Sequence, residues 1–426
     1  MRKRVVITGL GVVAPNAVGV PNFLAAIQAG RSGIAFHEEL AALKFSCQIG
    51  GIPPVTDEQK RQYFSDLQLH NLNSSGIIYG VMAGMEAWRD AGLPIATDEP
   101  DWESGIVFGT GMLGVDKFRE AIYKVDQGQV RRLGSTVVIQ TMTSGVSAFL
   151  GGQLGCGNQL SANSSACATG TEALLLAYDR IATGAGQRVL AGSCNDHGPY
   201  IWGGFDAMRI LPYQYNDRPE QASRPLSQTA SGFVPASGAG ALVVESLESA
   251  LARNATIYAE VLGGHVNSGG QRGGGSMTAP NALAVKRCIQ KAIEQANVQA
   301  EAIDVIDGHL TATTKDAAEV VAWCEALQRS GNDFPHINSL KSMIGHCLSA
   351  AGSIECVASV LELHHSFVYP SINSEDLHPD VSVLIDPQKI PQQLIHKDVQ
   401  LIAKANFGFG DVNACVILKR FQPQRV

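Results

Sequence analysis

Short apolar segments rich in valine, isoleucine and glycine alternate along this chain with longer segments of helical periodicity, and the same order occurs twice. Strands are predicted at 5–8, 105–109, 188–192 and 238–245 in the first half, and at 257–263, 304–307, 401–406 and 413–419 in the second, where residues 336–344 precede a predicted helix. Strands that alternate with helices favour buried, largely parallel sheets covered by helices. The order therefore predicts a duplicated α/β architecture, divided into residues 1–254 and 255–426.

The composition limits the kind of protein. A chain of 426 residues, 45% of them hydrophobic and 17% charged, can bury a large core. Its net charge of −7 argues against nucleic acid as a partner. Nine scattered cysteines without a metal-type spacing are typical of reduced thiols in the cytoplasm. No apolar run approaches the ~18 residues of a membrane span, and the basic start followed by glycines predicts a first buried strand instead of a signal peptide. We expect a cytoplasmic protein without a membrane or nucleic-acid partner.

The strongest local feature is a crowd of small residues around Cys167, in the segment 164–171 (SSACATGT). The residues that follow have apolar positions at helical spacing and end at Gly184, so Cys167 is predicted to lie where a helix begins. A helix N-terminus favours the thiolate, and small neighbours let a thin substrate approach closely. The segment indicates either a nucleophile or a buried cysteine in a tight packing seam.

Two of the eleven histidines have a suggestive context. His309 ends a predicted strand and opens a threonine-rich turn, and His346 follows Gly345 just before a predicted helix. Lys341 and Glu355 lie close enough in sequence to form an ion pair that orients His346. A cysteine with two histidines can be a nucleophile with its base, or a nucleophile with two donors that stabilise an enolate. Spacing alone leaves both open.

Several segments, in this order, resemble the elongating ketosynthases of type II fatty-acid and polyketide synthesis, which belong to the thiolase superfamily. They are 4–15 (RVVITGLGVVAP), 165–170 (SACATG), 203–209 (GGFDAMR), 222–225 (ASRP), 232–234 (GFV), 341–346 (KSMIGH), 350–352 (AAG) and 406–410 (NFGFG). The resemblance covers nearly the whole chain. It implies a thiolase-like α/β fold with duplicated βαβαβαββ halves in five αβαβα layers, with the cysteine in the first half and both histidines in the second.

The resemblance also implies the chemistry. An acyl group is transferred from its carrier to Cys167, and a malonyl-carrier thioester then loses carbon dioxide and attacks it. The implied residues are Cys167, His309, His346, Lys341 and Glu355 for catalysis; Cys167, Phe409 and Phe407 for the oxyanion hole and gate; Thr311 and Thr313 for pantetheine; and Met112 for the acyl pocket. No metal or redox cofactor is implied, because 4′-phosphopantetheine arrives on the acyl carrier protein. The implied assembly is a homodimer, or a heterodimer with a ketosynthase-like subunit. Lys60, Arg61 and Arg209 are candidates for carrier binding.

The chain departs from the family pattern at a few positions. Leu310 replaces the usual glycine after the first histidine, in a loop that is one residue shorter, and leucine adopts positive φ less freely. Ser237 and Asn195 each replace a common glutamate, and Asp411-Val412 replaces Gly-Thr after the gating loop. None of these departures removes a catalytic group. They favour a specialised ketosynthase, for a polyketide or polyene, over the housekeeping fatty-acid enzyme.

Three rival functions fit less well. A non-condensing chain-length factor typically lacks the cysteine that this chain retains. A thiolase places a second reactive cysteine in its C-terminal loop, where this chain has residues 406–411 (NFGFGD). A cysteine hydrolase explains neither the second histidine nor the gating loop.

Overall fold

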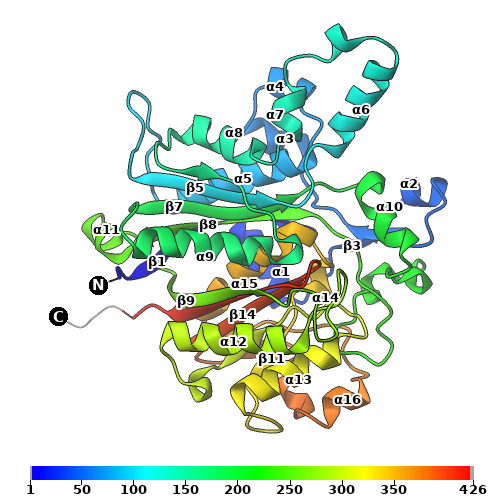
Figure 1. The fold of residues 1–426 in the computed structure, drawn as a ribbon, viewed down its shortest axis with the longest axis vertical. Coiled ribbons are helices and arrows are strands. Elements are labelled where there is room, and N and C mark those ends of the chain that lie inside the picture. Colours follow the sequence, from blue (N-terminus) through cyan, green and yellow to red (C-terminus); the bar gives the residue numbers. More distant parts are fainter. Residues whose placement is uncertain (1, 423–426) are drawn as a thin grey trace.

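The computed structural model describes residues 2–422, and a sheet of eleven strands runs through both halves of the chain (Figure 1). Ten strands follow the order β11-β10-β14-β15-β9-β1-β8-β7-β5-β6, and β2 pairs with the end of β1. In that order their bounds are His336–Asn338, Val305–Asp307, Leu401–Gly408, Val412–Arg420, Ala259–Ser268, Val5–Ala14, Gly238–Ser246, Arg188–Asn195, Ser104–Thr110 and Leu160–Ser161, with β2 at Ala17–Val18.

The two halves of this sheet repeat each other strand by strand. The sequence β1-β8-β7-β5-β6 corresponds to β9-β15-β14-β10-β11, with two antiparallel pairings followed by two parallel ones in each half. The predicted duplication is therefore confirmed. The expectation of largely parallel sheets is wrong for the inner strands. In the second half the reason is plain, since only residues 409–411 link β14 to β15, and so short a connection joins antiparallel strands.

Helices cover the outer faces of the sheet, and two further helices pack between its two halves, which gives five layers (Figure 1). The outer helices are α5 (Ser75–Asp90) and α8 (Gly145–Leu154) on one side, and α12 (Ala282–Ala296) and α13 (Asp316–Leu327) on the other; the central ones are α9 (Thr169–Ala182) and α15 (Ala351–His365). Alternate residues of β8 show that the sheet is packed against helices on both faces. Ala241 and Val243 belong to the core beneath α5, whereas Leu242 and Val244 belong to the core around α9 and α15. Burial on both faces explains why the strands are continuously apolar.

The halves meet where β1 pairs with β9. The contact is short, because only Val5–Ile7 pairs with Ala259–Val261. It is reinforced at the edge, where the guanidinium of Arg4 donates to both carboxylate oxygens of Glu260 at 2.7 and 2.8 Å. The first strand of the chain thus lies at the centre of the sheet.

The smaller elements lie around this framework. They are α1 (Val20–Gln28), β3 (Ile34–Phe36), α2 (Glu38–Ala42), β4 (Ile49–Gly51), α3 (Asp57–Arg61), α4 (Asp66–Asn71), α6 (Val115–Asp126), α7 (Val137–Thr141), α10 (Pro199–Ala207), α11 (Leu247–Ala252), α14 (Lys341–Ile344), β12 (Phe367–Val368), α16 (Pro379–Ser382) and β13 (Ile395–His396). Within residues 2–422, no helix has the length and apolar character to span a bilayer. The boundary between the two halves of the chain, placed between residues 254 and 255, stays a prediction.

The segment 336–344, which precedes His346, contains both a strand and a helical turn. Residues 336–344 form a strand only over His336–Asn338, and Lys341–Ile344 form a helical turn. The apolar residues Leu340, Met343 and Ile344 recur at i, i+3 and i+4, which is helical spacing. The turn ends at Gly345, whose positive φ of 70° a side chain would oppose.

Candidate active site

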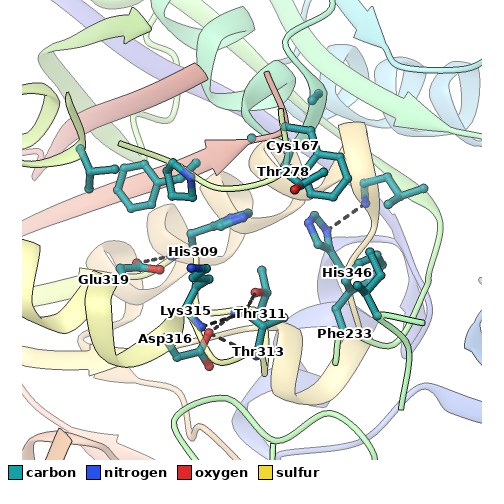
Figure 2. Close-up of a pocket in the computed structure, with 18 of the residues that line it drawn as sticks. Cys167, Phe233, Thr278, His309, Thr311, Thr313, Lys315, Asp316, Glu319 and His346 are labelled. Carbon is teal, nitrogen blue, oxygen red and sulfur yellow. Dashed lines mark hydrogen bonds between the residues drawn. The ribbon is translucent and has the colours of Figure 1, made fainter. Parts of the chain in front are cut away.

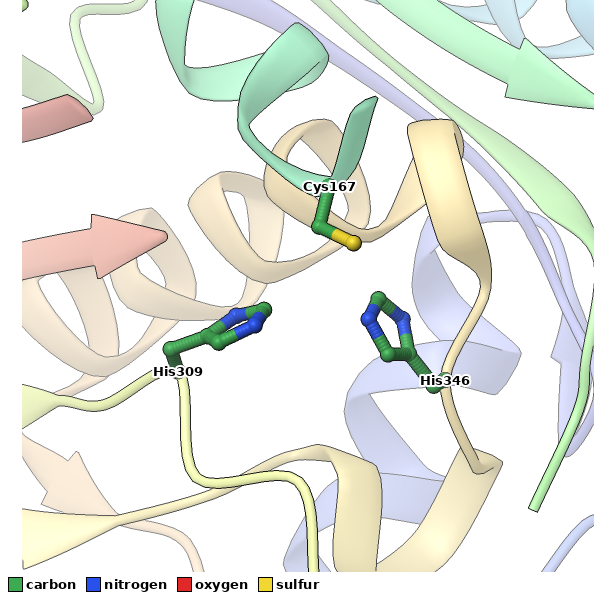
Figure 3. Close-up of side chains that lie close together, drawn as sticks. All are labelled: Cys167, His309 and His346. Atoms are coloured by element: carbon green, nitrogen blue, oxygen red, sulfur yellow. The ribbon is translucent and has the colours of Figure 1, made fainter. Parts of the chain in front are cut away.

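A cavity of about 740 Å³ brings together residues from both halves of the chain (Figure 2). Cys167 belongs to the first half, and His309 and His346 belong to the second. The Sγ of Cys167 and one ring nitrogen of each histidine all lie within 4.8 Å of one another. Figure 3 shows the cysteine between the two rings. The structure thus assembles the three residues that the sequence singled out.

Cys167 lies on a short 3₁₀ turn, Ala166–Ala168, that leads directly into α9. Ala166 has a φ of 47°, and the hydroxyl of Thr169 holds the turn by accepting from the N–H of Ser165 at 2.8 Å and donating to the carbonyl of Ala166 at 2.7 Å. A left-handed residue is costly unless its surroundings fix it, and strain of this kind is common at functional sites.

The pKa of the Cys167 thiol is raised by its surroundings. Burial raises its pKa to about 11, although Lys341 and the backbone N–H groups of Phe409 and Cys167 itself act in the opposite direction. Burial thus opposes the preference for the thiolate that a helix N-terminus is predicted to give. The backbone N–H groups of Phe409 and Cys167 thus both lie beside the Cys167 sulfur.

The end of β14 and the loop that follows it bring two aromatic rings to the cavity. Phe407 and Phe409 both line it, and the ring of Phe407 lies 6.0 Å from that of His309. The ring of Phe409 packs edge-on against Phe205 at 6.3 Å. The proposed gate residues therefore contact the site itself.

The hydrogen-bond partners of both histidines fix where their protons lie. The N–H of Leu348 donates to Nδ1 of His346 at 3.1 Å, so the proton of that ring is assigned to Nε2. The amide nitrogen of Asn406 lies 3.2 Å from Nδ1 of His309. Asn406 is oriented as a donor there, because its oxygen accepts from the hydroxyl of Thr171 at 2.6 Å. Both rings therefore carry the proton on Nε2.

Both histidines are neutral. Burial lowers the pKa of His346 to about 3 and that of His309 well below its usual value, and the charge of Lys341 adds to both effects. Two neutral N–H donors beside a cysteine suit the stabilisation of a developing enolate oxygen. They are poorly suited to act as bases, since a base requires a free nitrogen facing the substrate.

A buried ionic network lies behind the histidines. Glu355 binds Lys341 through one carboxylate oxygen and Lys404 through the other, the second contact measuring 2.7 Å, and all three side chains are at most 1% exposed. Burial pushes the pKa of Glu355 upward, but the two ammonium groups lower it to about 2. The predicted pairing of Lys341 with Glu355 occurs. Sequence reasoning missed Lys404, although a lysine within an apolar strand is a recognisable signal.

The His309 turn accommodates Leu310 without a positive φ at that residue. The left-handed position falls instead on Ala312, with a φ of 61°, and the side chain of Leu310 packs into the core. Glu319 accepts from the N–H groups of His309 and Leu310 at 2.7 and 2.8 Å. Burial raises the pKa of Glu319 to about 7. Glu319 anchors this turn, and the sequence analysis did not identify it.

The other predicted residues fall into two groups. Thr311, Thr313 and Met112 line the cavity, and the two threonine hydroxyls are 3.0 Å apart. Arg209 lies between the lining residues Met208 and Ile210. Lys60 and Arg61 do not line the cavity, and each already binds an acidic neighbour, Asp57 and Asp66 respectively.

Two further departures from the family pattern, Asn195 and Asp411, make hydrogen bonds that the structure shows. Asn195 lines the cavity beside Ser349, whose hydroxyl donates to the Asn195 side-chain oxygen at 2.7 Å. Asp411 is fully buried with a φ of 62°. Its carboxylate accepts from the N–H groups of Gln271 and Asn281 at 2.9 and 2.8 Å. Asp411 thereby ties the glycine-rich loop 269–281 to the segment that carries Phe409. Nothing in the structure explains Ser237.

We expect Asp411→Gly to loosen the loop 269–281, because glycine tolerates the positive φ but removes both carboxylate acceptors. Each hydrogen bond to a charged group contributes about 1.5–3 kcal/mol, so amide exchange in the loop should accelerate by more than about tenfold. Hydrogen–deuterium exchange of peptides from 269–281 measures this change. Asp411→Asn, which keeps one acceptor, should have an intermediate effect. Unchanged exchange in the glycine variant would show that other contacts hold the loop.

Comparisons with known proteins give a consistent result. Residues 2–250 match the family model "Beta-ketoacyl synthase, N-terminal domain", and residues 258–375 match "Beta-ketoacyl synthase, C-terminal domain". The chain is 34% identical to 3-oxoacyl-[acyl-carrier-protein] synthase I, chloroplastic, of Arabidopsis thaliana, over 99% of this chain and 88% of the relative. It is 33% identical to 3-oxoacyl-[acyl-carrier-protein] synthase 1 of Escherichia coli strain K12, over 99% of this chain and all of the relative.

Solved structures also match the chain over nearly its whole length. A β-ketoacyl synthase from Burkholderia phymatum STM815 superposes with a TM-score of 0.89 at 28% identity, and covers 99% of this chain and 100% of its own. A type II polyketide ketosynthase, solved in complex with its acyl-carrier protein and bound to a hexaketide, superposes with a TM-score of 0.87 at 28% identity and the same coverage.

Proposed function

We propose that this chain, which belongs to the β-ketoacyl synthase family, joins an acyl group held on Cys167 to a malonyl unit delivered by an acyl carrier protein, with loss of carbon dioxide. The proposal rests on three chemical groups, one thiol and two imidazoles, that lie around one point. A thiol and two neutral Nε2–H donors face the same cavity. Such an arrangement provides a site for the acyl chain and stabilisation for an enolate.

Acyl loading comes first. The Sγ of Cys167 attacks the carrier thioester, the new carbon–sulfur bond forms as the old one breaks, and the proton of Cys167 leaves on the pantetheine thiol. The N–H groups of Cys167 and Phe409 stabilise the oxyanion of the intermediate. The resulting acyl enzyme retains its chain while the carrier is exchanged.

Condensation follows. The malonyl thioester loses carbon dioxide, and its electron pair moves onto the thioester oxygen, to which His309 and His346 donate from Nε2. The enolate carbon then attacks the acyl carbon on Cys167. The carbon–carbon bond forms, the carbon–sulfur bond breaks, and the thiolate regains a proton from solvent. The product is a β-ketoacyl thioester on the carrier.

The proposed reaction needs no metal or redox cofactor, since phosphopantetheine is supplied by the carrier. Thiolate and imidazole are ligands that Zn²⁺ accepts. However, the fixed Leu348 N–H keeps Nδ1 of His346 unprotonated, so Nε2 of that ring retains its proton and cannot bind a metal as a neutral ligand. The site residues thus fit a pair of donors better than a metal centre.

The decisive experiment is intact-mass analysis after mixing the protein with acyl-carrier thioesters of graded length and saturation, in the presence of EDTA. The expected result is one acyl mass per chain, followed by β-ketoacyl product when malonyl-carrier is added. The preferred donor would also test our proposal that the chain is a specialised ketosynthase for a polyketide or polyene. Failure to load with every donor would contradict the proposed function.

We propose a dimeric, cytoplasmic enzyme, either a homodimer or a heterodimer with a ketosynthase-like subunit. The strand β6 ends the sheet, and its Leu160 is 40% exposed. Unpaired edges with exposed apolar residues are commonly covered by another chain. Light scattering of the purified chain distinguishes a self-associating subunit from one that requires a different partner.

Carrier binding is proposed for basic surface residues, with Arg209 beside the cavity and Lys60 and Arg61 outside its lining as candidates. Carriers are generally acidic, so charge reversal at a contact residue should raise KM for carrier-bound substrate by about tenfold at low salt. A small thioester mimic should be unaffected. Arg209→Glu is expected to have the largest effect, because Arg209 lies between two lining residues. Equal effects on the carrier and the mimic would rule out a carrier contact at that position.

A further inference from the structure

A second buried lysine adjoins the histidine site, and the reaction scheme above does not use it. Lys404 lies on β14, directly opposite Asp307 of β10 in the parallel register. Its side chain is fully buried. Its Nζ donates to Glu355 at 2.7 Å and to the carbonyl of Ala405 at 2.6 Å. A buried ammonium is costly unless paired, so a lysine is retained at such a place only with well-placed partners.

The side chains around Lys404 form a continuous path to the catalytic histidine. The carboxylate oxygen of Glu355 that accepts from Lys404 also accepts from the amide of Asn406 at 2.8 Å. The same amide lies 3.2 Å from Nδ1 of His309. An amide nitrogen has two hydrogens, so Asn406 can serve both acceptors at once. Lys404 and Asn406 are two residues apart on one strand and therefore share a face.

The network contains two cations and two acids. Lys341 and Lys404 are the cations, and Glu355 lies between them as one anion. Asp307 is the second acid facing Lys404; burial raises its pKa to about 6, with Lys404 acting in the opposite direction. One oxygen of Asp307 accepts from Ser359 at 2.7 Å. Removing Lys404 alone would leave two carboxylates to share one ammonium group.

We propose that Lys404 is a positioning residue for condensation: its ammonium holds Glu355 against the amide of Asn406, which keeps the proton of His309 on Nε2, facing Cys167. This proposal rests on the proposed function, because it assigns Lys404 a role in that reaction. Lys341 alone cannot replace Lys404, since it binds the other oxygen of Glu355. Without Lys404, Glu355 no longer holds the Asn406 amide and the Thr171 hydroxyl alone opposes its rotation, so His309 can then carry its proton on Nδ1.

The test uses two variants of the full chain. Lys404→Met removes the charge, and Lys404→Met with Asp307→Asn removes one charge of each sign, so that the network stays balanced. The single variant is expected to lose thermal stability, and the double variant to regain most of it. In the double variant, malonyl decarboxylation and condensation should fall by about tenfold or more, while acyl loading of Cys167 stays within about threefold of the wild type. A purely structural role predicts that condensation recovers together with stability.

Nitrogen NMR of ¹⁵N-histidine-labelled protein provides a readout that does not depend on activity. The signal of His309 is assigned by its loss in His309→Ala. It should report the Nε2–H tautomer in the wild type and a shift towards Nδ1–H in the double variant. This readout separates failure of the proposal from failure of the proposed function, since the tautomer can be observed even if no substrate loads.

The matched control is Glu362→Gln. Glu362 lies in the same buried region, where burial raises its pKa well above the usual value, and it accepts from Asn338 at 2.8 Å. Glutamine preserves a neutral acceptor there, so tautomer and rates should match the wild type. An unchanged His309 tautomer in the double variant, or condensation restored to the wild-type rate, would overturn the assignment of Lys404.

Discussion

Replacing Cys167 with alanine is expected to abolish acyl loading and chain extension, with a loss of about a thousandfold or more, because Cys167 is the one cysteine among the described residues that line the cavity. Decarboxylation of malonyl-carrier should continue. It requires only the two histidine donors, and neither is bonded to the cysteine in the structure. Intact mass measures loading, and release of labelled carbon dioxide measures decarboxylation.

The matched control for this variant is Cys324→Ala. Cys324 is a partly exposed cysteine on α13 that is not among the residues lining the cavity. Its variant should load and extend normally. Loading of the Cys167→Ala protein would place the nucleophile elsewhere. Loss of decarboxylation as well would indicate that the thiol takes part in that step, contrary to the division of roles proposed above.

Replacing either His309 or His346 with alanine should give the opposite pattern. Removing one preorganised donor to a developing oxyanion costs about 10²–10³ in rate, so decarboxylation and condensation should fall by that factor. Loading of Cys167 depends on the backbone N–H groups and should be largely retained. His396→Ala, which alters an exposed histidine on β13, is the control. Equal losses in loading and decarboxylation would contradict the assignment of both rings to the enolate.

The pH dependence follows from the same neutral rings. A donor role requires uncharged imidazole, and the pKa of His346 is lowered to about 3, mainly by burial. Its neutral form therefore persists as the pH falls, and is lost only as the pH approaches that value. We expect decarboxylation to be nearly constant between about pH 8 and about pH 5, where an ordinary histidine with a pKa near 6.5 would already have become charged. A drop in rate centred near pH 6.5 would show that the rings are more exposed to water than the structure indicates.

Most of the long strands could be located from the sequence because they are buried on both faces and are therefore continuously apolar. Cys167 was recognisable for a similar reason, since its small neighbours mark a close approach of backbone. Whether neighbouring strands run parallel or antiparallel was harder to predict. Periodicity reports burial within a segment, whereas direction depends on which segment lies next to it. Residues 336–344 show this limit, because the helical spacing within the apolar run became clear only with the turn at Gly345 in view.

The supporting residues of the site were the hardest to find. Glu319 and Lys404 are separated from His309 by ten and by nearly a hundred residues, and their partners are backbone N–H groups and a carboxylate brought close by the fold. Lys404 did carry a signal, as a charge inside an apolar strand. Asp411 carried one as well, in its place within a glycine-rich turn. A signal of this kind identifies an unusual residue, but only the tertiary structure identifies what the residue binds.

The central place of the first strand has a consequence for how the protein is made. β1 ends at Ala14, yet its neighbours in the sheet, β8 and β9, begin at Gly238 and Ala259. During synthesis, more than half of the chain must therefore emerge before this apolar strand can pair along its length, beyond the two residues at its end that pair with β2. Contacts of such long sequence separation slow folding and leave edges exposed. The nascent N-terminus of this enzyme should accordingly depend on chaperones that bind apolar segments, and should be protected from protease only after residue 261 has left the ribosome.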